Sequence, residues 1–227
     1  MSDFALWVKY IFFPPKCKSC GELTGGEGFC PKCKNSAEAL KLKGEDICLR
    51  ITNPFIKKFY ASYYYDESPR GAVLEAKFYR PSRFINTLLT DISIDIKEIL
   101  SQNSIDIIIS VPFHKSKLHR FEFDVPKEMA KRIGTGFNIP VATPIEKVRR
   151  TAKQHSLSLE GRKVNLIGAF KMVGDVRGKN ILLIDDVITS ANTVIVLATQ
   201  LKIAGAKDII AWAYTYNNHK KGEKYGK

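Results

Sequence analysis

The stretch from Ile181 to Thr193 constrains this chain more than any other part of its sequence. Its first four residues are large and apolar, as in the buried strands of a parallel sheet. Asp185 and Asp186 follow at the carboxyl end of that strand, the edge at which ligands bind in open α/β sheets. A turn of small and hydroxyl-bearing residues then leads into a helix. The pattern predicts a strand, an acid pair, a loop and a helix N-terminus in one continuous unit.

The loop after the acid pair is suited to a phosphate group. Backbone N–H groups of such a turn, and of the helix N-terminus beside it, point towards an anion. The two carboxylates suit the ribose diol of the same ligand. A purely structural explanation, in which the acids cap the helix or bind a stray ion, accounts less well for two consecutive acids. The candidate ligand-binding residues are Asp185, Asp186, Val187, Ile188, Thr189, Ser190, Ala191, Asn192 and Thr193.

The remaining apolar patterns predict strands that alternate with helices, which is typical of a parallel sheet with helices on both faces. We expect a linker helix over 51–60, a half-buried strand at 63–65 and a turn at 66–71. A chain of 227 residues accommodates one such α/β domain and a small appendage. We place the appendage and its linker at residues 1–60 and the domain at 61–227. Further strands are expected at 105–111, near 141, at 181–184 and at 209–216, and helices at 84–100, 125–133 and 192–204.

Four of the five cysteines form two CxxC pairs: Cys17, Cys20, Cys30 and Cys33. Four thiolates with this spacing can surround one zinc ion as a closed tetrahedron with no open position, so the site would be structural. Binding would then drive the folding of a segment too small for its own core. The alternative is a pair of redox-active dithiols. Cys48 lies outside the pattern and is expected to be a buried, inert thiol.

The charge of the chain is strongly basic, at +13, which attracts nucleic acid, anionic lipid or phosphorylated ligands. Between Pro112 and Lys163 basic residues outnumber acidic ones about two to one. A basic surface that serves solubility alone is the other explanation. No apolar run reaches the roughly 18 residues of a membrane span, and the run from Ala5 to Phe13 contains Lys9 and lacks the features of a signal peptide. We therefore expect a cytosolic protein.

The stretch from Ile181 to Thr193 resembles the motif with which type I phosphoribosyltransferases bind 5-phosphoribosyl-1-pyrophosphate (PRPP). Ala191 stands where that family usually has glycine, and its Cβ would narrow or reshape the phosphate loop. A second loop, after the strand that ends at Pro112, is similar to the family's pyrophosphate loop. The resemblance implies a type I phosphoribosyltransferase-like fold that binds PRPP with Mg²⁺. It also implies pyrophosphate contacts from Pro112, Phe113, His114 and Lys115.

The order of these motifs along the chain resembles the ComF family of competence proteins. The CxxC pairs come first, a Val-Pro-x-His loop follows, and an Asp-Asp-Val loop comes last. The block from Arg150 to Phe170 agrees with the family's Arg…Gln…Leu…Arg…Asn…Ala-Phe stretch. Two features depart from the family. Phe121 to Asp124 stand where members usually have Arg-Gly-Phe-Asn, which removes a basic contact, and some members carry a second cysteine quartet.

The resemblance implies an accessory protein of natural transformation that keeps a PRPP site and handles incoming single-stranded DNA. Its partners would be PRPP, single-stranded DNA and other competence proteins. Its place would be the cytoplasm, with peripheral attachment at the inner face of the membrane left open. The alternative is an active phosphoribosyltransferase that transfers ribose 5-phosphate from PRPP to an acceptor. No catalytic residue is assigned, because a surface role explains the candidate bases His114, His119 and His155 more simply.

Overall fold

The computed structural model describes residues 16–17, 20–24, 30–42, 48–49, 51–78, 81–112, 123–149, 168–189 and 191–217. In these parts of the chain a six-stranded sheet has the order β1-β2-β8-β7-β3-β4. All neighbouring strands are parallel except β1, which runs antiparallel to β2. The strands are β1 Cys48–Leu49, β2 Lys58–Tyr64, β3 Ile107–Ser110, β4 Val141–Ala142, β7 Asn180–Ile188 and β8 Asp208–Tyr216.

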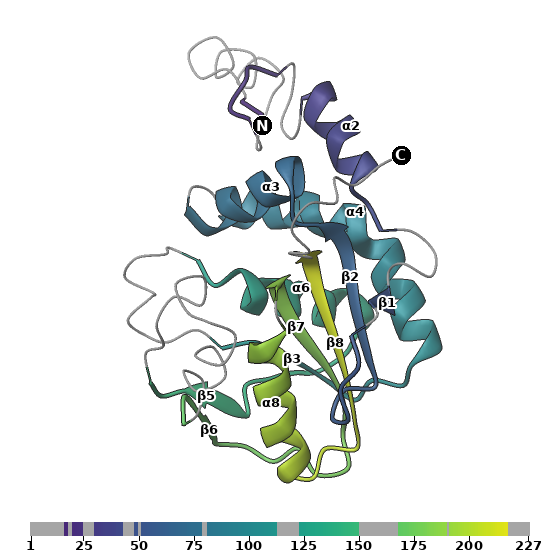
Figure 1. Cartoon of the computed structure of the whole chain (residues 1–227), viewed down its shortest axis with the longest axis vertical. Coiled ribbons are helices and arrows are strands. Elements are labelled where there is room, and N and C mark those ends of the chain that lie inside the picture. Colours follow the sequence, from purple (N-terminus) through teal and green to yellow (C-terminus); the bar gives the residue numbers. More distant parts are fainter. Residues whose placement is uncertain are drawn as a thin grey trace.

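Helices cover both faces of this sheet. The connections β3 to β4 and β7 to β8 run in opposite directions along the sheet, and right-handed crossovers therefore place α6 and α8 on opposite faces. Figure 1 shows α8 in front of the sheet and α4 and α6 behind it. A separate antiparallel pair is formed by β5 Ile145–Lys147 and β6 Phe170–Met172. The helices are α2 Pro31–Ala39, α3 Glu67–Phe78, α4 Pro81–Gln102, α6 Val125–Phe137 and α8 Asn192–Ile203.

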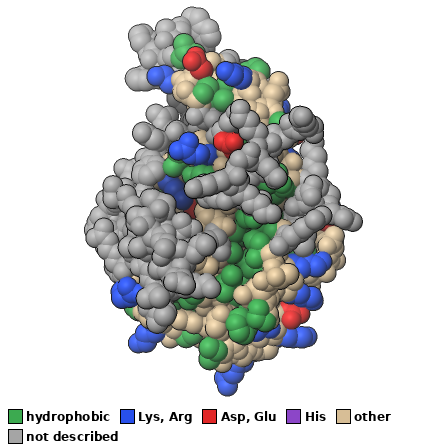
Figure 2. Space-filling model, in the orientation of Figure 1, with side chains coloured by type: hydrophobic (Ala, Val, Ile, Leu, Met, Phe, Trp, Pro, Cys, Tyr) green, Lys and Arg blue, Asp and Glu red, His purple; other side chains and the backbone are tan. Residues whose placement is uncertain are grey.

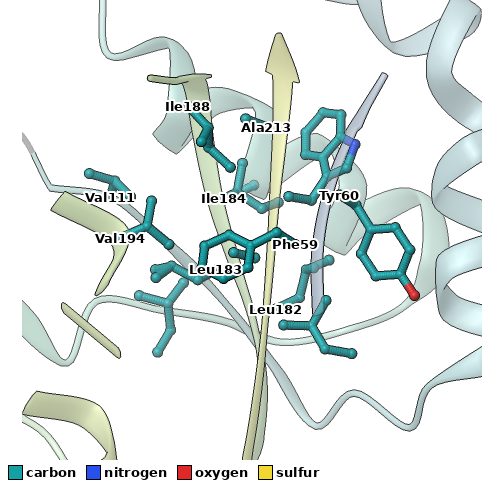
Figure 3. Packing of buried hydrophobic residues seen from close by; sticks show 14 of the residues in the cluster. Phe59, Tyr60, Val111, Leu182, Leu183, Ile184, Ile188, Val194 and Ala213 are labelled. Atoms are coloured by element: carbon teal, nitrogen blue, oxygen red, sulfur yellow. The ribbon is translucent and has the colours of Figure 1, made fainter. Parts of the chain in front are cut away.

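The core lies on both sides of the central strands β7 and β8. Their residues are apolar on both faces because helices exclude water from each side of a parallel sheet. Figure 3 shows Phe59 of β2, Leu183 of β7 and Val194 of α8 gathered on one side. On α4, Ile92, Ile96 and Ile99 recur at helical spacing and are buried. The sheet therefore forms a rigid platform for the loops at its carboxyl edge.

The structure confirms the predicted α/β fold and corrects three of its details. The segment 51–60 is not a linker helix, since β2 begins at Lys58 and pairs in parallel with β8. The segment 66–71 is not a turn, since α3 begins at Glu67. Strand β7 does not end before the acid pair but continues to Ile188. In each case long-range pairing or packing extends an element beyond what its local composition indicates.

Helix α3 lies beyond the carboxyl end of the sheet. In Figure 1 it crosses above the arrowheads of β7 and β8, and α2 lies further out on the same side. Its packing partners are chiefly α2 and α4. Within the described residues, no helix combines the length and the apolar character needed to cross a bilayer.

Candidate functional site

Asp185 and Asp186 lie inside β7, and this decides where their carboxylates point. Asp185 pairs with Ala213 of β8, and the pairing of the two strands continues through Ile188. Successive residues of an extended strand start towards opposite faces, but here the two carboxyl groups come back within hydrogen-bonding reach of each other. Asp185 faces the loop that precedes α8. Asp186 contacts Lys77 of α3.

The loop before α8 forms a small pocket of about 50 Å³ with Asp185 at one side. Ala191 is the N-cap residue of α8 and has φ 56° and ψ 0°, in the left-handed region. Its methyl group cannot cap the helix, so the first turn of α8 has no side-chain cap there. The helix therefore presents its N-terminal amides at the pocket. The lining residues are Asp185, Val187, Ile188, Thr189, Ala191, Asn192, Thr193 and Val194.

Asp186 forms an ion pair with Lys77, which lies in the last turn of α3. Lys77 Nζ lies 2.5 Å from Asp186 Oδ2, and the two side chains are only 21% and 7% exposed. Burial opposes the charge on Lys77, but attraction to Asp186, their hydrogen bond and attraction to Asp185 outweigh it and raise the pKa of Lys77. The lysine therefore stays charged across the physiological range.

Asp185 is held by its own backbone. The amide of Asp186 donates a hydrogen bond of 2.8 Å to Asp185 Oδ1. Burial, followed by repulsion from Asp186, raises the pKa of Asp185 well above its usual range, although Lys77 acts in the opposite direction. The raised pKa of Asp185 favours its protonated form over a second negative charge beside Asp186.

A third carboxyl group, Asp124, lies in the same electrostatic environment. It is the N-cap residue of α6 and accepts a hydrogen bond of 3.0 Å from the Lys127 amide. Burial raises the pKa of Asp124 to about 6 against that hydrogen bond, and repulsion from Asp186 adds to the rise. A carboxyl group with this pKa can gain and lose a proton near neutral pH.

Sequence reasoning missed Lys77 and assigned no role to Asp124. The signal for Lys77 was present in the helical spacing of Ala72, Val73 and Ala76, all of which are fully buried in α3. Asp124 was counted as part of a departure from the family pattern, yet Asp is as good an N-cap as the Asn usual there. Only the fold shows that both side chains approach Asp186.

Several predicted residues lie outside the described parts of the chain. They are Phe113, His114, Lys115 and Ser190, together with the candidate bases His119 and His155. Pro112 is described, and it lies at the carboxyl end of β3. The preceding amide of Val111 donates a hydrogen bond of 2.8 Å to the Ile184 carbonyl, which holds this end of β3 beside β7.

The four predicted cysteines converge on one point. The Sγ atoms of Cys17, Cys20, Cys30 and Cys33 all lie within 4.8 Å of one another. Cys20 Sγ and Cys30 Sγ are 3.8 Å apart, which matches two thiolates of a tetrahedral ion at about 2.3 Å from each sulfur. The sequence explains the local shape, because Cys30 is the N-cap of α2 and Pro31 occupies its first turn.

The cysteine cluster also has the electrostatics of a cation site. The amide of Cys30 donates a hydrogen bond of 3.2 Å to Cys17 Sγ, and the amide of Cys33 donates one of 3.5 Å to Cys30 Sγ. A backbone hydrogen bond at Glu22 favours the Cys20 thiolate, but desolvation and the three neighbouring thiols raise the pKa of Cys20 to about 12. Four thiolates this close therefore need a bound cation.

Comparison with known proteins agrees with this architecture. A family model described as a phosphoribosyl transferase domain matches residues 125–227. The DNA utilization protein YhgH of Salmonella typhi is 33% identical over 111 residues, which cover 47% of this chain and 48% of that protein. Ribose-phosphate pyrophosphokinase of Chlorobaculum tepidum is 28% identical over 137 residues, covering 52% and 42%. The chain thus spans about half the length, or less, of these curated relatives.

Among solved structures, one of adenine phosphoribosyltransferase is similar, with a TM-score of 0.42 at 10% identity over 63% of this chain and 74% of that one. The observed parallel sheet flanked by helices and the matched domain define a protein with the type I phosphoribosyltransferase fold. With the four-cysteine cluster at its N-terminal side and the similarity to YhgH, the chain fits a ComF-like protein.

Proposed function

We propose that this protein binds PRPP at the carboxyl edge of its sheet and acts as an accessory protein in natural transformation. The observation that carries the proposal is the pocket shared by Asp185 and the loop before α8. The 5-phosphate would occupy the loop formed by Thr189, Ser190, Ala191, Asn192 and Thr193. Asp185 and Asp186 would accept hydrogen bonds from the ribose hydroxyls, and Pro112 to Lys115 would meet the pyrophosphate.

Mg²⁺ would enter this site with PRPP and would neutralise part of the charge of its pyrophosphate. The cysteine cluster would hold Zn²⁺ in a structural role, and the sulfur spacing of 3.8 Å supports that assignment. We also propose an organisation into a cysteine module with its linker over 1–60 and a phosphoribosyltransferase-like domain over 61–227. That boundary falls inside β2, whose pairing with β8 would join the two parts.

The DNA part of the proposal rests on charge and on relatives. Several relatives carry the name DNA utilization protein. We define the basic rim as Lys57, Lys179 and Lys207, exposed residues just before β2, β7 and β8. A backbone hydrogen bond joins the Lys207 amide to the Lys179 carbonyl, and another holds the Lys57 amide to the Ile209 carbonyl of β8. Figure 2 shows basic side chains at the lower edge of the molecule. The rim lies at the amino ends of three parallel strands, whereas the proposed PRPP pocket lies towards their carboxyl ends.

Single-stranded DNA bound along this rim would gain affinity from the release of condensed counterions. The protein would act in the cytoplasm or at the inner face of the membrane, where other competence proteins would be its further partners. PRPP and DNA would then occupy opposite edges of the same sheet and would not compete for one cleft.

The second candidate function is phosphoribosyl transfer, and Asp124 is the observation that favours it. In such a reaction the bond between C1 of the ribose and the pyrophosphate oxygen breaks while a bond from the acceptor to C1 forms. The acceptor must lose a proton, and a carboxylate with a pKa of about 6 beside Asp186 is suited to take it. Pyrophosphate would leave with its Mg²⁺.

Thermal unfolding of the full chain with and without PRPP and Mg²⁺ tests the binding proposal. PRPP at about 100 times its Kd should stabilise the wild type by about 2.7 kcal/mol. The double variant D185A/D186A should lose this stabilisation, whereas D175A, which removes an exposed acid, should keep it. Equal stabilisation of D185A/D186A would place the site elsewhere. Release of pyrophosphate with a candidate acceptor, absent in D124N, would favour the transferase.

A further inference from the structure

The ion pair between Lys77 and Asp186 needs an explanation beyond the stability of the fold. Bringing two charges out of water costs several kcal/mol per ion, and an apolar pair of similar volume often stabilises a protein as well or better. Here the two side chains are 21% and 7% exposed, so the pair is far from a solvated surface contact. A lysine so nearly buried beside a predicted ligand-binding acid points to a role in that site.

The position of Lys77 gives it access to Asp186 from outside the sheet. Helix α3 packs chiefly on α2 and α4, while Lys77 in its last turn reaches β7. Cations are favoured in the last turn of a helix because the helix dipole is negative there. The lysine therefore links α3 to β7. Figure 1 shows this helix above the arrowhead of that strand.

Other charged and titratable groups surround the same carboxylate. Asp185 comes from β7 itself and Asp124 from the N-terminus of α6, while Tyr65, from the segment after β2, lies near Lys77. Lys77 is the cation whose contact with Asp186 the structure records. Without its charge, three carboxyl groups would share a partly desolvated space, and such groups resist simultaneous ionisation.

We propose that Lys77 is a positioning residue of the PRPP site, which holds the Asp186 carboxylate charged and in a fixed orientation so that it can accept ribose hydroxyls. The inference rests on the proposed function, because it concerns the same acid. It predicts that ligand affinity depends on the charge at position 77 and not only on the packing of α3.

The replacement K77M keeps the length and apolar stem of the side chain but removes the charge. A buried carboxyl group without its counter-charge takes up a proton more readily, and protonation turns one of its two oxygens from an acceptor into a donor and removes the charge that strengthens the hydrogen bonds from the ribose. Affinity of K77M for PRPP should therefore fall as pH is lowered. We expect binding at least about 10-fold weaker than that of the wild type at pH 6, with a smaller ratio at pH 8.

Two further variants separate charge from packing. K77R keeps a cation and should bind PRPP within about 3-fold of the wild type at both pH values. K41M is the matched control, because Lys41 forms a second nearly buried pair with Asp95, at 3.9 Å and with 18% and 5% exposure. It should bind PRPP as the wild type does. The phosphates of PRPP themselves titrate, with a second pKa of about 6. Dividing the Kd of each variant by that of the wild type at the same pH cancels this effect.

Isothermal titration calorimetry with PRPP and Mg²⁺ at pH 6 and pH 8 provides the measurement. Binding of K77M equal to that of the wild type at both pH values would overturn the inference and leave PRPP binding by the wild type intact. A wild type that binds no PRPP would overturn the proposed function and the inference with it. If K77M does not melt cooperatively, the affinities of K77R and D186N for PRPP test the inference instead. K77R must then keep its affinity, and the affinity of D186N must fall by about 10-fold or more.

Discussion

At the scale of single residues, Ala191 shows how a substitution can leave a loop intact and still cost stability. The sequence has alanine where the related motif usually has glycine, and the backbone keeps the conformation that glycine favours, with φ 56°. An L-residue with a Cβ pays about 1 kcal/mol or more in this region. The backbone at Ala191 therefore keeps a left-handed conformation in spite of its side chain.

Replacing Ala191 by glycine should stabilise the chain by about 0.5 to 1 kcal/mol, because the relief of strain exceeds the entropy that glycine adds to the unfolded state. Tm should rise by about 1 to 4 °C for a chain of this size. The matched control is A198G in the buried interior of α8, which should lower stability by about 1 kcal/mol. Loss of stability in A191G, measured by urea unfolding, would contradict the prediction.

At the scale of elements, helix α2 and the cysteine cluster form one unit. Cys30 caps the helix and Cys33 lies in its first turn, so a metal bound to both would fix the helix N-terminus directly. The segment Leu40 to Leu42 then joins β2, since the Leu42 amide donates to the Ser62 carbonyl and the Tyr64 amide to the Leu40 carbonyl. Metal binding is thereby connected to the edge of the main sheet.

We expect the purified chain to contain one zinc ion, and C33S to lose most of it, because three thiolates leave the tetrahedron open. C48S is the control, since Cys48 lies in β1 and outside the cluster, and it should retain the metal. Metal content by mass spectrometry and Tm with and without a chelator measure both effects. Equal zinc in C33S and the wild type would exclude the proposed ligand set.

Among the elements, those with strong local patterns were predictable from the sequence. The helix expected at 84–100 is α4, and the strands expected at 105–111 and 209–216 are β3 and β8. The incorrect predictions concern segments whose structure is determined by pairing with strands far away in the sequence. β2 becomes a strand through its pairing with β8, and β7 extends past two acids because β8 continues to pair with it. Such pairing cannot be read from a local window.

At the scale of the whole molecule, the net charge of +13 predicts that binding to single-stranded DNA depends strongly on salt concentration. Binding of a labelled single-stranded oligonucleotide, followed by fluorescence anisotropy, should weaken about 10- to 100-fold between 50 and 200 mM salt. K207A, in the basic rim, should reduce the slope of log K against log salt by about 0.7. K97A, an exposed lysine on α4, should leave the slope unchanged. The opposite result would place the DNA on another face.

The candidate site itself was only partly predictable. The acid pair, the loop and the cysteines share short stretches of sequence, so their chemistry could be inferred from spacing. Lys77 and Asp124 lie far from Asp186 in sequence and meet it only because α3 and α6 both end or begin at the carboxyl edge of the sheet. The extension of β7 through both acids, and the closeness of their two carboxyl groups, could not be inferred from this short stretch of sequence either.

The strand order has a consequence for how this protein is made. β8, the last strand in chain order, stands between β2 and β7, so a chain interrupted before Asp208 would consist of two ribbons with unpaired edges. The completed sheet requires contacts between residues about 150 positions apart, which favours slow folding. The ribosome must therefore synthesise almost every described residue before β8 can complete the centre of the sheet. Chains that terminate early should be substrates for proteolysis.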